Sequence, residues 1–454
     1  MSSARCLAVV LLVAAVLGAA CFRGRGSAPV DLDAAKRAYV HGRPIACAAG
    51  EPTTVYIGDP LYVDDRSWLP SAPVSGRVVG FEISAQRARL SCEFVGNDPE
   101  RAFGASIAVV ELGEDRELLA VGAPGVVRSD VRGQVRLHRS WELVRSSPAH
   151  LEWPDASTAG TRADEFGAAL ACLRGPTPDE GRLAVGAPTL GSGGGVALFA
   201  LPKGTPIATR LGPAGKSGYG GCLAAVPDRD GDGIEDLAVS CGSAGGVDVL
   251  SSADLSVVQS RALAGAAYSE SMLLDELADA QGTRWLAHVV ERIGDRTLSV
   301  QRGVGADTVA ARVHAPGRHS GWGFARSAHL YLARADGAGS LAYVFTDAGY
   351  LDLSRRPGLG ASLYGIGAGV TVPQGELRVP VVHRVDRLDA PEVRTALPGF
   401  VNSGLGAESA LIGDVDGRGR PDLVLTTSKG LDWRAVVYSL DADGVLFELS
   451  PQPR

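Results

Sequence analysis

The sequence predicts an all-β fold, namely a β-propeller built from four-stranded antiparallel blades. Its 454 residues include 59 Gly and 26 Pro, and so many turn-forming residues suit short strands joined by tight turns and disfavour long helices. Hydrophobic residues make up 45% of the chain, which is enough to bury a large core. A pattern also recurs, in which an aromatic-Gly pair precedes an apolar strand and then a strand that starts with Gly. Self-similarity of this kind is typical of repeat folds.

Three copies of this pattern align well. The first leads from Phe103-Gly104 to Gly122-Ala123-Pro124, and the second leads from Phe166-Gly167 to Gly186-Ala187-Pro188. The third begins at Tyr219-Gly220 and continues with an apolar strand that ends at Val239. Three weaker copies begin at Trp322-Gly323, Tyr364-Gly365 and Leu405-Gly406.

The spacing of these pairs sets the number of blades. One blade of four strands needs about 40 to 50 residues, and the interval from Tyr219 to Trp322 has room for two, the second starting near Tyr268. Seven blades fit best, and six or eight also fit. A small antiparallel sheet cannot bury both of its faces alone, whereas radial stacking buries them and leaves only short outer edges.

The Phe-Gly and Gly-Ala-Pro elements of the first two copies resemble the FG-GAP repeat, which occurs in the propellers of integrin α-subunits and in many bacterial exported proteins. The resemblance implies a propeller with calcium loops inside β-hairpins and a role in binding a ligand.

The strand pattern is clearer at the C-terminal end of the repeat region than at its N-terminal end. The last unit is expected to hold four strands, at 409–412, 423–426, 433–440 and 445–449, with an Asp443-Gly444 hairpin turn before the fourth. The propeller is expected to span 51–454, with the repeats over 103–454. Residues 51–100 contain strand candidates at 53–57 and 77–84, which either close the ring or cap it.

The N-terminal 21 residues match an export signal. Arg5 is followed by an apolar run over 7–17, too short to cross a bilayer, and by small residues up to Cys21. Cys21 also resembles the acylated cysteine of bacterial lipoproteins, so we expect residues 22–50 to form a tether. The protein is then a monomer at the cell surface or in the periplasm that meets the membrane only through its anchor. Cleavage without acylation would give a secreted protein instead.

A loop rich in aspartate is the strongest chemical motif of the chain. Asp228, Asp230, Asp232 and Asp236 occupy positions 1, 3, 5 and 9 of the loop, and the Ile234 carbonyl lies at position 7. Calcium prefers six to eight hard oxygen ligands, and this spacing aims several at one point. An EF-hand is disfavoured because its position-12 glutamate is replaced by an apolar strand residue. We therefore predict a calcium site in a β-hairpin.

A second loop shares this frame. It keeps Asp414, Asp416 and Asp422 at positions 1, 3 and 9, but Arg418 replaces the acid at position 5. The loop either binds a second calcium ion more weakly or keeps its turn without the ion. The corresponding loops of the first two repeats, 111–117 and 174–182, lack the aspartates, and no metal is expected there.

The cysteines of the mature chain allow two pairings. Cys222 and Cys241 flank the first metal loop almost symmetrically, so a disulfide across the hairpin is expected in an oxidising compartment. Cys47 and Cys92 form the other candidate pair, which leaves Cys172 as a thiol.

Several functions are disfavoured. The net charge of −7 offers no basic face for nucleic acid, and no nucleophile elbow, phosphate loop or His-Glu-x-x-His motif is present. We expect a calcium-stabilised, non-enzymatic propeller that binds a protein or a polysaccharide. The alternative is a propeller-type polysaccharide lyase or glycoside hydrolase. Both metal loops should open on one face, which would leave the opposite face for the ligand.

Overall fold

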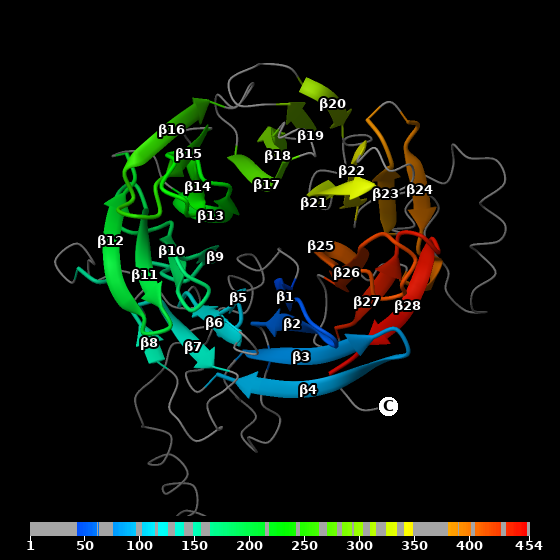
Figure 1. The fold of residues 1–454 in the computed structure, drawn as a ribbon, viewed down its shortest axis with the longest axis horizontal. Coiled ribbons are helices and arrows are strands. Elements are labelled where there is room, and N and C mark those ends of the chain that lie inside the picture. Colours follow the sequence, from blue (N-terminus) through cyan, green and yellow to red (C-terminus); the bar gives the residue numbers. More distant parts are fainter. Residues whose placement is uncertain are drawn as a thin grey trace, which may run out of the picture.

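In the computed structural model, the described residues are 43–60, 62, 76–96, 102–113, 117–125, 132–139, 149–155, 164–213, 218–241, 246–262, 270–278, 284–292, 295–302, 309–314, 324–333, 340–347, 380–388, 390–400, 405–427 and 433–451. They form seven four-stranded sheets, and neighbouring strands of each sheet are antiparallel and consecutive in sequence. The sheets stand around a central axis as the blades of a propeller, with the first strand of each blade nearest the axis (Figure 1). This confirms the predicted fold class.

Blades 1 to 4 contain the following strands: β1 (Ile45–Ala48), β2 (Thr53–Asp59), β3 (Arg77–Ser84) and β4 (Arg87–Val95); β5 (Ser106–Glu111), β6 (Glu117–Ala123), β7 (Gln134–Arg139) and β8 (Ala149–Leu151); β9 (Ala169–Arg174), β10 (Gly181–Ala187), β11 (Gly195–Leu201) and β12 (Thr205–Leu211); β13 (Tyr219–Val226), β14 (Asp236–Cys241), β15 (Gly246–Leu250) and β16 (Val257–Ala262). Blades 5 to 7 contain β17 (Glu270–Ala278), β18 (Arg284–Arg292), β19 (Asp295–Arg302) and β20 (Val309–His314); β21 (Phe324–Ala333), β22 (Ser340–Asp347), β23 (Val381–Val385) and β24 (Val393–Ala396); β25 (Leu405–Ile412), β26 (Asp422–Thr427), β27 (Ala435–Ser439) and β28 (Gly444–Leu449). A short 3-10 helix, Pro398–Phe400, precedes blade 7.

The ring closes by packing between the first and last blades, without a shared strand. Each innermost strand contacts the innermost strands of the neighbouring blades, and β25 of blade 7 contacts β1 of blade 1. One apolar cluster joins the two blades, with Val55 and Phe81 on one side and Val424 and Trp433 on the other. The described residues between 51 and 96 therefore close the ring as part of a complete blade. That blade begins with β1, which lies inside the segment expected to be a tether.

The blade count is as predicted, but one expected blade start is replaced by another. Tyr364-Gly365, expected to open a blade, lies outside the described residues. The strands on either side of it, β22 and β23, pair with each other in blade 6. The seventh blade is instead blade 1. Tyr268 and Trp322-Gly323 also lie outside the described residues, and β17 and β21 begin two residues or fewer after them.

Close backbone contacts between blades explain the recurring glycines. Gly122 on β6 faces Gly167 of the next blade, where a Cβ atom at position 122 would lie 2.1 Å from the Gly167 carbonyl oxygen. Gly167 itself has a φ of +89°, a conformation that side chains disfavour. The aromatic residue before it, Phe166, is fully buried between the blades. The Phe-Gly and Gly-Ala-Pro elements are thus two halves of one blade-to-blade contact.

Candidate metal centre

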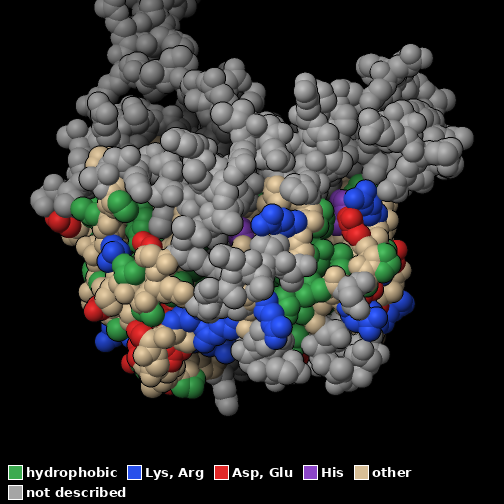
Figure 2. Space-filling model, turned by 90° about the horizontal axis from the view of Figure 1, so that it is seen from above, with side chains coloured by type: hydrophobic (Ala, Val, Ile, Leu, Met, Phe, Trp, Pro, Cys, Tyr) green, Lys and Arg blue, Asp and Glu red, His purple; other side chains and the backbone are tan. Residues whose placement is uncertain are grey.

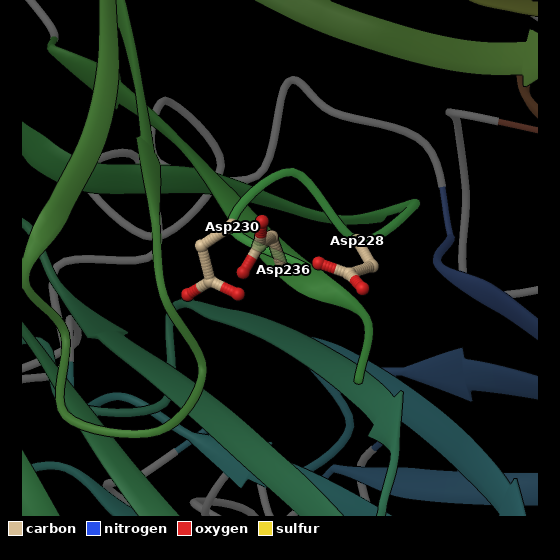
Figure 3. A group of neighbouring side chains, drawn as sticks. All are labelled: Asp228, Asp230 and Asp236. Atoms are coloured by element: carbon tan, nitrogen blue, oxygen red, sulfur yellow. The ribbon is translucent and has the colours of Figure 1, made fainter. Parts of the chain in front are cut away.

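The first aspartate loop lies in blade 4, between β13 and β14, as the sequence predicts. Oxygen atoms of Asp228, Asp230 and Asp236 all lie within 4.8 Å of one another. Figure 3 shows the three carboxylates gathered inside the loop, with Asp236 projecting from the start of β14. A group of three acidic oxygens this close can hold one hard cation.

The loop backbone orders itself around these side chains. Asp228 accepts hydrogen bonds from the backbone N–H groups of Gly231 and Gly233, at 2.7 and 2.8 Å. These bonds lower the pKa of the Asp228 carboxyl. Asp232 accepts a hydrogen bond from the Ile234 N–H at 2.8 Å and is exposed. Three of the four predicted carboxylates therefore come together, while Asp232 is outside that group.

Asp236 is the buried member of the group. Its Oδ2 accepts a 2.7 Å hydrogen bond from the Arg229 N–H, whereas its Oδ1 is buried without a hydrogen-bond partner. Burial, followed by the nearby charges of Asp230 and Asp228, raises the pKa of the Asp236 carboxyl. A bound cation would satisfy the unpartnered oxygen and remove the repulsion between the acids.

The second aspartate loop lies in blade 7, between β25 and β26. Oxygen atoms of Asp414, Asp416 and Asp422 lie within 4.8 Å of one another. Asp414 accepts a 2.7 Å hydrogen bond from the Gly419 N–H, which matches the bond from Gly233 to Asp228 in the first loop. Burial, with further contributions from Asp416 and Asp414, raises the pKa of Asp422 to about 6. Among the described residues, these two loops are the groups that could hold a metal ion.

Contacts between loops place both metal loops on one face of the ring. The face is made by the loops that join the first and second strands of the blades, and we call it the metal-loop face. The links between neighbouring loops of blades 1 to 4 run from the Ala49 N–H to Glu111, from the Gly113 N–H to the Pro178 carbonyl, and from the Arg174 N–H to Glu235. The loop of blade 7 borders that of blade 1 across a shared cavity. The loops of blades 7 and 1 to 4 thus form one continuous rim.

This cavity has a volume of about 680 Å³ and lies between blades 1 and 7. Its lining residues include Glu51, Glu82, Arg87, Arg89 and Asp414. Arg89 donates a 2.8 Å hydrogen bond from Nε to Glu82, whereas Glu51, Arg87 and Asp414 are exposed at the cavity. Sequence reasoning missed this site, because its residues come from opposite ends of the chain.

On the side of the molecule shown in Figure 2, the described surface has no strong excess of acidic or of basic side chains. Acidic, basic and apolar side chains are interspersed there. Among the described residues, no helix is long and apolar enough to cross a membrane. Cys21 and the expected signal segment lie outside the described residues.

The cysteine pairings are not supported. Cys222 is present as a thiol and lies in an irregularity of β13, where the register pairs Cys241 with Tyr219. The expected symmetric hairpin would have paired Cys241 with Cys222 itself.

The second pairing is contradicted by the order of strands in blade 1. Cys47 on β1 and Cys92 on β4 are both thiols. They lie on the first and fourth strands of one sheet, about 14 Å apart at the usual strand spacing, and a disulfide needs Cα atoms within about 7 Å. Cys172 is a thiol, as expected.

Comparison with known proteins gives no match, either among protein-family models or among characterised sequences. The similarity to FG-GAP repeats therefore rests on the residues quoted above and on the fold they form. The chain is a seven-bladed β-propeller with two aspartate loops on one face.

Proposed function

We propose that the protein is an exported, calcium-stabilised binding propeller of the FG-GAP type, without enzymatic activity of its own. The observation that carries the calcium assignment is the buried, unpartnered Oδ1 of Asp236 beside the carboxylates of Asp228 and Asp230. Oxygen-only donor sets of this kind suit calcium, which accepts flexible geometry and carboxylate ligands.

The ion would act on the fold through the first metal loop. Asp228, Asp230 and Asp236 would hold it, and Asp232 and the Ile234 carbonyl are further oxygen donors of the same loop. The calcium ion supplies positive charge where three carboxylates converge. Because it binds the folded loop and not the unfolded chain, it stabilises the native state by mass action.

The same loop touches both neighbouring blades. Glu235 accepts a hydrogen bond from the Arg174 N–H of blade 3, at 2.9 Å. Arg284 of blade 5 donates a 2.9 Å hydrogen bond to the Asp228 carbonyl oxygen. Ordering this loop would therefore stabilise blades 3, 4 and 5 together.

The ligand site that we propose is the cavity between blades 1 and 7. Its exposed groups include the carboxylates of Glu51 and Asp414 and the guanidinium of Arg87, so it offers both donors and acceptors to a polar ligand such as a glycan or a peptide. It opens on the metal-loop face, whereas the sequence-based expectation placed the ligand on the opposite face. We also propose export through residues 1–21 and anchoring at Cys21.

Glycan and peptide arrays test the binding role. We expect a ligand whose binding falls at least tenfold in Glu51→Ala and Arg87→Ala variants, because both side chains border the cavity. Arg312→Ala, which changes an exposed arginine on β20, is the matched control and should bind normally. Cleavage of a polysaccharide by the wild type, in a parallel substrate panel, would contradict the non-enzymatic role.

A further inference from the structure

The two metal loops have similar backbone conformations but differ in charge. The first loop, 228–236, contains five acidic residues and one arginine, whereas the second, 414–422, contains three acidic residues and two arginines. Both have glycines of positive φ at loop positions 4 and 6. Since both loops make the same turn, they differ in the positive charge that balances the negative charge of the converging carboxylates.

In blade 7 that balance comes from Arg418. Its Nε lies 3.4 Å from Oδ2 of Asp416, and its backbone N–H donates to Oδ1 of Asp414 and of Asp416, at 2.9 and 3.1 Å. Ser439 donates a further 2.6 Å hydrogen bond to the same Oδ2 of Asp416. The Asp416 carboxylate, which would otherwise serve as a metal ligand, is thus already paired with the Arg418 guanidinium and the Ser439 hydroxyl.

Arg420 links the same loop to acidic residues of blades 6 and 7. It forms ion pairs with Asp386 of blade 6, at 2.8 Å, and with Asp441 of the β27–β28 turn, at 3.1 Å. In the first loop, the corresponding position is the apolar Ile234. At this position the second loop therefore has ion pairs that the first loop, with Ile234, cannot form.

The two loops also differ in their buried oxygens. Oδ1 of Asp236 in the first loop is buried without a partner, and none of the carboxylate oxygens in the described second loop is in that state. A cation would satisfy this oxygen of the first loop, and the second has no comparable buried oxygen left over.

We propose that Arg418 acts as a tethered cation in place of a metal ion, so that the blade 7 loop stays folded without calcium. A guanidinium remains charged at all accessible pH values and repels a second cation at short range. The protein would then bind a single calcium ion, in blade 4. The seam at which blades 7 and 1 close the ring would not depend on calcium. The statement about blade 4 rests on the proposed function, whereas the statement about Arg418 does not.

Exchanging position 5 between the loops tests this proposal. Isothermal titration calorimetry with calcium chloride, after removal of metal with EDTA, gives the number of ions bound by each protein. We expect one ion for the wild type, two for Arg418→Asp, none for Asp232→Arg and one for the double exchange. Arg418→Lys keeps the charge and should bind one ion, like the wild type. Both positions are exposed, so the exchanged proteins should fold, and circular dichroism checks that they do.

The outcomes separate the two statements. Two ions in the wild type, or no additional ion in a folded Arg418→Asp protein, would overturn the role of Arg418. No ion in the wild type together with one in Arg418→Asp would refute the calcium site of blade 4 and support the tethered cation. One ion retained by Asp232→Arg but lost from Asp416→Asn would place the metal in blade 7 and overturn the proposal.

Discussion

The indole Nε1 of Trp433 donates a 2.8 Å hydrogen bond to Oδ2 of Asp59, across 374 positions of the chain. Asp59 ends β2 in the first blade, and Trp433 precedes β27 in the last. The same buried carboxylate pairs with Arg43, at 3.3 Å, and with Arg77, at 3.2 Å. One side chain therefore collects three donors at the point where the ring closes, in addition to the apolar packing there.

Removing this carboxylate should open the seam between blades 1 and 7. Asp59→Ala leaves two arginines without their buried partner, and breaking a buried pair in this way costs about 3 to 5 kcal/mol. Trp433→Phe deletes one hydrogen bond to a charged group, worth about 1.5 to 3 kcal/mol, and also leaves a small cavity where the larger indole was buried. Glu82→Ala removes the half-buried partner of the exposed Arg89 and should cost less than about 1 kcal/mol. Urea denaturation measures all three, and equal losses for Asp59→Ala and Glu82→Ala would contradict this account of closure.

The contact between blades at Gly122 should not tolerate a methyl group. Gly122→Ala would place a Cβ atom 2.1 Å from the Gly167 carbonyl oxygen, which forces blades 2 and 3 apart. Overpacking of this kind costs about 1 to 3 kcal/mol. Gly399→Ala is the control, because a Cβ atom there would meet nothing within 4 Å. A thermal midpoint for Gly122→Ala that equals that of Gly399→Ala would show that the glycine is not needed for packing.

Acid should destabilise the protein through two histidines. Burial is the main cause that lowers the pKa of His138 and of His329 to about 4, from an ordinary value near 6.5. The unfolded chain therefore binds protons that the folded state excludes, and stability is lost as pH falls from about 6.5 to about 4. Replacing both histidines with glutamine should flatten the dependence of the urea midpoint on pH across this window. An unchanged slope in the double variant would contradict the assignment.

Four cysteines should react slowly in the folded protein. Burial raises the pKa of Cys47 and Cys172 to about 12 and that of Cys222 to about 11, and it also raises the pKa of Cys92. Since the thiolate is the reactive form, iodoacetamide at pH 8 should modify these residues only after unfolding. Mass spectrometry of the peptides measures the modification, and a peptide that links Cys222 to Cys241 would reverse our conclusion about that pair.

The parts of the fold that the sequence predicted are those that local chemistry controls. Aromatic-Gly pairs mark blade starts because the glycine must adopt positive φ against the neighbouring blade, as Gly104 and Gly167 do. Leu405-Gly406 also marks a blade start, as predicted, because Gly406 adopts positive φ as well, although Leu405 is not aromatic. The aspartate spacing likewise fixes the turn of both metal loops.

The failures have physical causes as well. Two strands of blade 1 were expected, but the segment was not identified as a full blade, because its contact residue, Gly58, stands in an Ile57-Gly58-Asp59-Pro60 segment instead of Gly-Ala-Pro. A Cβ atom at Gly58 would lie 2.1 Å from the Gly104 carbonyl oxygen, so this glycine permits the same close contact between blades as Gly122. The cysteine pairing failed because the start of β13 carries an irregularity that shifts the register. The same shift occurs at the starts of β21 and β25 and leaves no mark in local composition.

The most direct test of the account is the effect of calcium on stability in the wild type and in Asp236→Asn. At calcium one hundred times its dissociation constant, the wild type should gain about 2.7 kcal/mol over its stability in EDTA. Asp236→Asn keeps the size of the side chain but loses the buried charge, so calcium should change its stability little. This result would place the stabilising ion at the carboxylates of blade 4. An equal gain in both proteins, or no gain in the wild type, would contradict the central claim.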